Sequence, residues 1–74
     1  MPKTPRITAA ELVKALQKLG FQIARIKGSH HVLKHVDGRR TVVPVHRGEV
    51  IGVGLMSKIL VEAEITIDEL IELL

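Results

Sequence analysis

The sequence contains no cysteine, tryptophan or tyrosine, and its only large aromatic residue is Phe21. Without cysteine the chain has no disulfide, no thiolate nucleophile and no thiolate metal ligand. Proteins that read unpaired bases by stacking need several aromatic rings. A base-reading sheet of the RRM or OB type is therefore not expected.

The chain also lacks any apolar run near the roughly 18 residues that a membrane span requires, and no signal-peptide pattern opens it. We therefore expect a cytoplasmic protein with no membrane contact. Its 74 residues suffice for one domain, residues 1–74, with the proline-containing residues 1–6 as a loose arm. Because 46% of the residues are hydrophobic, we expect a partner chain to cover some apolar surface.

Charge is unevenly distributed along the chain, which has a formal net charge of +3. The segment 21–47 has a single acidic residue, Asp37, but six basic ones: Arg25, Lys27, Lys34, Arg39, Arg40 and Arg47. The segment from Gly48 onward is acidic, with Lys58 as its only base. A cationic patch attracts a polyanion through counterion release, although an ordinary solvated surface has the same composition.

Helical and strand signals alternate in one simple order. Thr8 and Glu11 form a capping box before apolar residues at helical spacing, and Gly20 is placed to end that helix. Strands are predicted at 21–27, with Phe21 and Ile23 on the core side, at 30–35 and at 40–45. Gly28-Ser29 and Asp37-Gly38 supply the turns.

Pro44 cannot donate a ladder hydrogen bond, so the third strand is expected at a sheet edge. A loop is predicted at 46–54, followed by an amphipathic helix whose apolar residues extend from Leu55 to Ala63. Thr66 and Glu69 form a capping box for a last short helix. The order α-β-β-β-α-α predicts an α+β domain, with helices on one face of a three-stranded antiparallel sheet and a basic, exposed opposite face.

His30 follows the Gly28-Ser29 turn inside the cationic segment. An imidazole can remove the 2′-hydroxyl proton of RNA, and nearby cations can stabilise charge on the attacked phosphate. The alternative is that His30 only pairs within its turn. His46, at the end of the third strand, is either a second acid–base group or a loop anchor. The candidate RNA-binding residues are Lys27, Ser29, Arg39, Arg40, Arg47 and Lys58.

A metal site is not expected, because there is no cysteine and strand alternation puts His31 and His35 on the face opposite His30. We expect no cofactor.

Several short motifs together resemble one known family, the HicA-type mRNA interferase toxins, also called YcfA-like. They are Gly28-Ser29-His30-His31, Asp37-Gly38-Arg39, Val43-Pro44-Val45-His46, Gly48-Glu49 and Gly54-Leu55 with Lys58-Ile59-Leu60. Leu19-Gly20-Phe21 and residues 65–69 match as well. The resemblance runs from about Thr8 to the end of the chain.

The resemblance implies a double-stranded-RNA-binding-domain-like fold and a ribosome-independent, metal-independent endoribonuclease of a type II toxin–antitoxin system. It implies that His30 is catalytic and that a HicB-type antitoxin blocks the active surface. Leu33 and Glu64 depart from the aromatic residue and the glycine common in such toxins. Two alternatives stay open: a non-catalytic double-stranded-RNA-binding module, and an inactive toxin-like subunit of a repressor complex.

Overall fold

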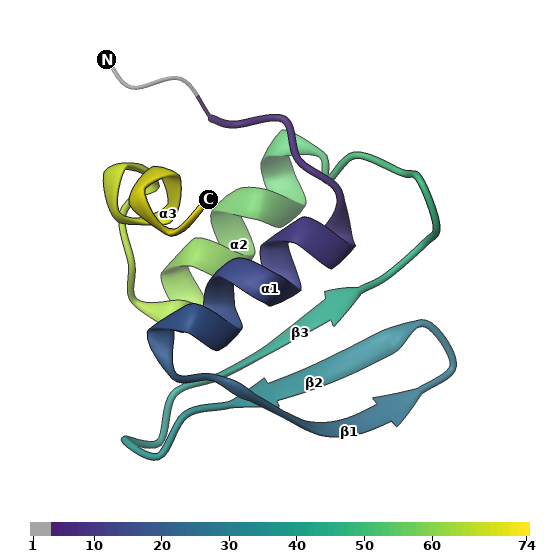
Figure 1. The fold of residues 1–74 in the computed structure, drawn as a ribbon. Helices are drawn as coiled ribbons and strands as arrows, with labels where there is room; N and C mark the ends of the chain where they lie inside the picture. Colours follow the sequence, from purple (N-terminus) through teal and green to yellow (C-terminus); the bar gives the residue numbers. More distant parts are fainter. Residues whose placement is uncertain (1–3) are drawn as a thin grey trace.

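The computed structural model describes residues 4–74, so the first three residues of the predicted arm lie outside the described residues. Six elements follow in the order α1 Ala9–Leu19, β1 Gln22–Lys27, β2 His30–Lys34, β3 Arg40–Pro44, α2 Val53–Ala63 and α3 Ile67–Leu73. This order confirms the predicted α+β class and its double-stranded-RNA-binding-domain-like arrangement. All three helices lie on one side of an open antiparallel sheet (Figure 1).

Local signals explain where the helices begin and end. Thr8 and Thr66 each complete the predicted capping box, with Glu11 and Glu69 respectively. Gly20 ends α1 in the left-handed conformation, at φ 112°. Helix α2 begins at Val53, two residues earlier than predicted, because Gly52 takes the extended N-cap conformation. The loop before it is tied to the chain start, since Ile51 N–H donates to the Ile7 carbonyl at 2.9 Å.

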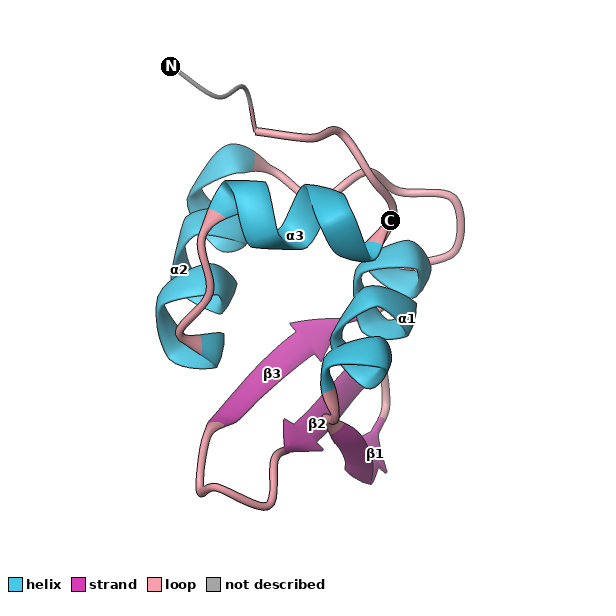
Figure 2. Cartoon of the chain, turned by 60° about the vertical axis from the view of Figure 1, so that its left-hand side comes forward, coloured by secondary structure: helices cyan, strands magenta, loops and turns pink. Residues whose placement is uncertain are grey.

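The sheet order β1-β2-β3 places Pro44 on an edge strand, as predicted. The helices pack on one face of the sheet and contact mainly β3. On that face Leu33, Thr41 and Val43 are fully buried. Ile23 pairs with Leu33 and shares its face, yet it is 38% exposed. The predicted face of Ile23 is therefore confirmed, but the packed helices do not bury it, because β1 is exposed along its whole length. Figure 2 shows α1, α2 and α3 on the same side of the sheet as this face.

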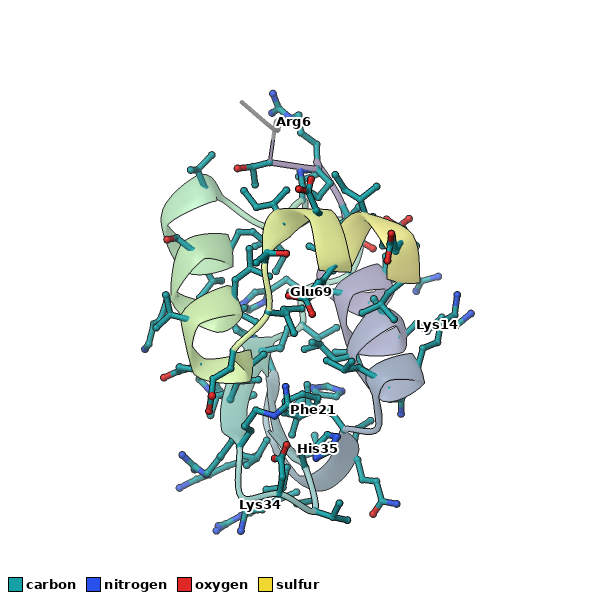
Figure 3. The ribbon with its side chains drawn as sticks, turned by 90° about the vertical axis from the view of Figure 1, so that its left-hand side faces the viewer. Arg6, Lys14, Phe21, Lys34, His35 and Glu69 are labelled. Atoms are coloured by element: carbon teal, nitrogen blue, oxygen red, sulfur yellow. The ribbon has the colours of Figure 1, made fainter. Side chains whose placement is uncertain are left out.

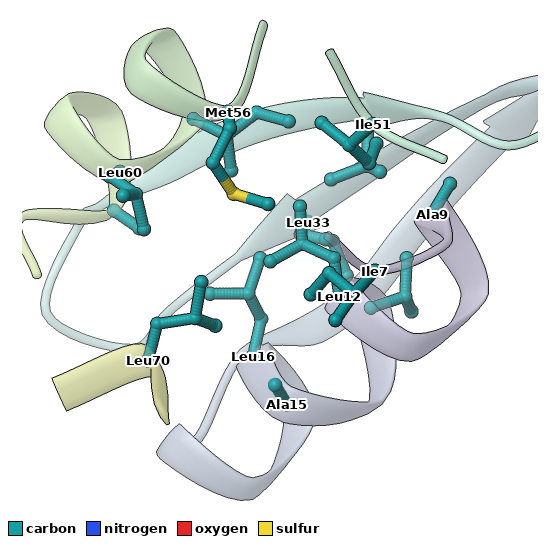
Figure 4. Packing of buried hydrophobic residues seen from close by; sticks show 14 of the residues in the cluster. Ile7, Ala9, Leu12, Ala15, Leu16, Leu33, Ile51, Met56, Leu60 and Leu70 are labelled. Atoms are coloured by element: carbon teal, nitrogen blue, oxygen red, sulfur yellow. The ribbon is translucent and has the colours of Figure 1, made fainter. Parts of the chain in front are cut away.

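The core lies between the sheet and the helix layer. Leu12 and Leu16 of α1 and Met56 and Leu60 of α2 belong to this core, and Leu33 of β2 lies among them (Figure 4). Leu70 of α3 is fully buried and closes the core from the far side of the helices. None of the described helices is long and apolar enough to cross a membrane.

Glu64 ends α2 at φ 57° and ψ 44°, the left-handed region that costs a non-glycine residue about 1–2 kcal/mol. It is the only described non-glycine residue with positive φ. We expect Glu64→Gly to raise the free energy of unfolding by about 1 kcal/mol. Urea unfolding followed by far-UV circular dichroism measures the change.

Ser57→Gly is the matched control, because Ser57 is exposed within the same helix at ordinary helical dihedrals. We expect it to lower the free energy of unfolding by about 0.5 kcal/mol. Equal destabilisation by both glycines would contradict the strain at Glu64.

Candidate active site and cationic sheet face

The turn between β1 and β2 has only two residues, Gly28 and Ser29. Gly28 alone of the two has positive φ, at 59°, as the first position of a type II′ turn requires. Lys27 and His30 therefore face each other as Cα partners beside the turn. Ser29 is half-buried, and its carbonyl accepts a hydrogen bond from Val45 N–H at 2.7 Å, which ties the turn to the end of β3.

Strand alternation sends His30 to the sheet face that no helix covers. Its neighbours His31 and Leu33 point to the helix side, where His31 Nδ1 lies 3.2 Å from the Ser29 carbonyl. His30 itself is exposed. The predicted separation of His30 from His31 and His35 is thus confirmed. The predicted exposed basic face is confirmed as well.

An open hollow of about 450 Å³ occupies this uncovered face. His30 lines it together with four cationic side chains, whereas Val32 and Val42 form its floor. We call this surface the cationic face; its basic residues are Arg25, Lys27, Lys34 and Arg40. Figure 3 shows Lys34 pointing away from the helix layer. A negatively charged strand lying across the face would contact these cations and His30 together.

Arg39 was predicted to bind RNA, but in the structure its side chain makes hydrogen bonds within the protein. Its Nη1 donates to the Ala63 carbonyl at 2.7 Å, and its Nε donates to Asp37 Oδ2 at 2.8 Å. The guanidinium also stands 5.2 Å from the centroid of the Phe21 ring. Arg39 therefore joins the second hairpin turn to the end of α2 and lies outside the cationic face.

His35 belongs to the same structural cluster, where it packs edge-on against Phe21 (Figure 3). Its Nδ1 lies 3.2 Å from the Asp37 backbone nitrogen and 3.1 Å from Asp37 Oδ1, and its Nε2 lies 3.2 Å from the Leu19 carbonyl. The Arg39 backbone N–H holds the pKa of Asp37 below its ordinary value. Ionised Asp37 therefore stabilises the turn fully at any pH above the ordinary carboxyl pKa of the unfolded chain. This stabilisation is lost as the pH falls through the lowered pKa of Asp37 in the folded protein.

The remaining candidates do not line the cationic face. His46 lines a second hollow beyond Pro44, Arg47 lies in the turn after β3, and Lys58 is exposed on α2 in the helix layer. Sequence reasoning did not name Arg25 or Lys34 as site residues, although both are basic residues in predicted strands. Among residues 4–74, no three histidine, aspartate or glutamate side chains gather as a metal ligand set.

Fold and site together define a small α+β protein with a double-stranded-RNA-binding-domain-like architecture and a histidine on a cationic sheet face. The profile of the family described as "HicA toxin of bacterial toxin-antitoxin" matches residues 9–65. The chain therefore belongs to the HicA toxin family. It is a toxin of a toxin–antitoxin system and has a cognate antitoxin partner. No curated protein sequence matches it significantly.

Arg39 and Arg40 are adjacent in sequence, yet the Arg39 side chain contacts α2 and Phe21 whereas the Arg40 side chain lies on the exposed cationic face. We expect Arg39→Ala to lower the free energy of unfolding by about 2 kcal/mol, because it removes a charge-assisted hydrogen bond and the packing on Phe21. Arg40→Ala, on the exposed face, should change it by less than about 0.5 kcal/mol. Urea unfolding of both variants compares them, and similar losses would contradict the structural role of Arg39.

Proposed function

We propose that this toxin is an endoribonuclease, an mRNA interferase of a type II system, that cleaves RNA on its cationic face. The observation that carries the proposal is the exposed imidazole of His30 sharing one hollow with Arg25, Lys27, Lys34 and Arg40. Membership of the HicA toxin family supports it. The cations hold the phosphate backbone of a single RNA strand, and His30 meets the scissile linkage.

In the proposed reaction, His30 takes the proton of a ribose 2′-hydroxyl as general base. The 2′-oxygen then forms a bond to the adjacent phosphorus, and the bond from phosphorus to the 5′-oxygen breaks. The products are a 2′,3′-cyclic phosphate and a 5′-hydroxyl, whose oxygen takes its proton from water, and the protonated His30 then returns its own proton to water. Lys27, the Cα partner of His30, and the neighbouring cations stabilise the added negative charge on the phosphate oxygens.

The proposed reaction requires neither a metal ion nor the ribosome, because the base and the charge stabilisation come from this chain. The proposed antitoxin is of the HicB type. It would silence the toxin by covering the cationic face and excluding RNA.

We expect His30→Ala to lower the rate of RNA cleavage by about 10²- to 10⁴-fold, the usual contribution of a general base. The assay incubates pure protein and EDTA with single-stranded RNA and follows the products on a gel. His31→Ala is the matched control, because that neighbouring ring lies on the helix side of the sheet.

Cleavage by the wild type and the His31 variant, but not by the folded His30 variant, is the expected result. Binding of duplex RNA with no cleavage by the wild type would instead favour a non-catalytic RNA-binding module. Cleavage that survives His30→Ala in a folded protein would remove the histidine from the mechanism.

We also expect the salt dependence of RNA binding to report on the cationic face. Arg40→Ala should reduce the slope of log affinity against log salt concentration by about 0.7 for single-stranded RNA, because one phosphate contact is lost. Lys58→Ala removes the same charge from the helix layer and should leave the slope unchanged. Fluorescence anisotropy with labelled RNA at several salt concentrations measures both. Equal effects would indicate diffuse attraction rather than a defined face.

A further inference from the structure

A second hollow, of about 180 Å³, lies at the end of β3 beside the proposed cleavage site. Pro44 forms one wall and is the Cα partner of His30 on the neighbouring strand. Ile51 and Leu55 add apolar wall, and His46 and Glu49 supply the polar groups. Ala9 of α1 and Leu55 of α2 also line the hollow, so it lies around the β3 edge from His30, and a base next to a phosphate at His30 reaches it by turning over Pro44.

We infer that this hollow binds one base of the RNA, a guanine next to the cut, with Glu49 as the residue that determines specificity. The inference rests on the proposed function, because it needs RNA on the cationic face. Ligand pockets for drug-sized molecules measure about 300–1,000 Å³, so this hollow suits a single ring system.

Charge decides which part of the RNA the hollow can accept. Among residues 4–74, no lysine or arginine lines it, and Glu49 places a carboxylate there. A carboxylate repels phosphate but accepts hydrogen bonds from the N–H groups of a base. The phosphates therefore stay with the cations around His30, and the base enters the hollow.

Glu49 and His46 are held at the two ends of one turn. Glu49 N–H donates to the His46 carbonyl at 3.1 Å, and Gly48 within the turn has φ 76°. This turn holds the backbones of His46 and Glu49 close together, and both residues line the same hollow. Histidine is one of the rings on which unpaired RNA bases stack, and Phe21 is too deeply buried for that role.

Hydrogen-bond geometry selects guanine among the four bases. The Watson–Crick edge of guanine carries two adjacent donors, N1–H and N2–H, which both oxygens of one carboxylate can accept. Adenine and cytosine each present one donor beside an acceptor, and uracil presents a single donor between two acceptors. Each of these other bases would set a lone pair against the Glu49 carboxylate.

The test maps cleavage sites in a randomised single-stranded RNA library for the wild type, Glu49→Gln and Glu72→Gln. We expect the wild type to cut beside guanine and Glu49→Gln to lose that preference by about 5- to 100-fold. Its preference should move toward adenine and cytosine, because an amide both donates and accepts, as the edges of these two bases require. Glu72→Gln removes the same charge from exposed α3 and should leave the profile unchanged.

A binding selection separates this inference from the proposed reaction. The same library is selected on His30→Ala protein with and without Glu49→Gln, so that base preference is read without cleavage. Guanine enrichment that disappears with Glu49→Gln supports the inference even if the wild type cuts nothing. No guanine enrichment, or the same enrichment with Glu49→Gln, overturns it while cleavage by the wild type leaves the proposed function standing.

Discussion

The two-residue turn at Gly28 and Ser29 is the constraint on which the rest of the site depends. A turn of this length fixes the register of β1 against β2, and a register slip of one residue would move every side chain to the other face. The 2.7 Å bond from Val45 to the Ser29 carbonyl extends the same register to β3. The register set by this turn places the His30 side chain on the same face of the sheet as the cations.

The same register places the core residues on one face of the sheet and the cationic residues on the other. Leu33, Thr41 and Val43 are buried under the helices, whereas Arg25, Lys27, Lys34 and Arg40 line the hollow on the opposite face. The polar group buried on the core side is satisfied, since Thr41 Oγ1 donates to Glu62 at 2.8 Å. The core therefore holds the sheet rigid while the uncovered face keeps polar groups free for a ligand.

Sequence patterns predicted the order of the elements, both capping boxes and the two faces of β2, because these follow from local spacing and alternation. They could not show how far the helices extend over each strand, so the face of Ile23 was predicted but its exposure was not. The same limit applies to Arg39 and Arg40. Both are cations beside a turn in the sequence, and only tertiary contacts with Ala63 and Phe21 distinguish the structural arginine from the exposed one.

In the proposed function, charge segregation lets one face serve both RNA cleavage and its inhibition by the antitoxin. Most carboxylates after Gly48 belong to α2, α3 and the turn between them, in the layer opposite the cationic face. Within residues 4–74, no acidic side chain lines the hollow that holds His30, so its cations have no internal partner there. Any chain that covers this face must bring carboxylates to replace the lost hydration of four cations. Such a partner would compete with RNA for the same four cations. Substitution of these cations would therefore weaken both RNA binding and inhibition by the partner.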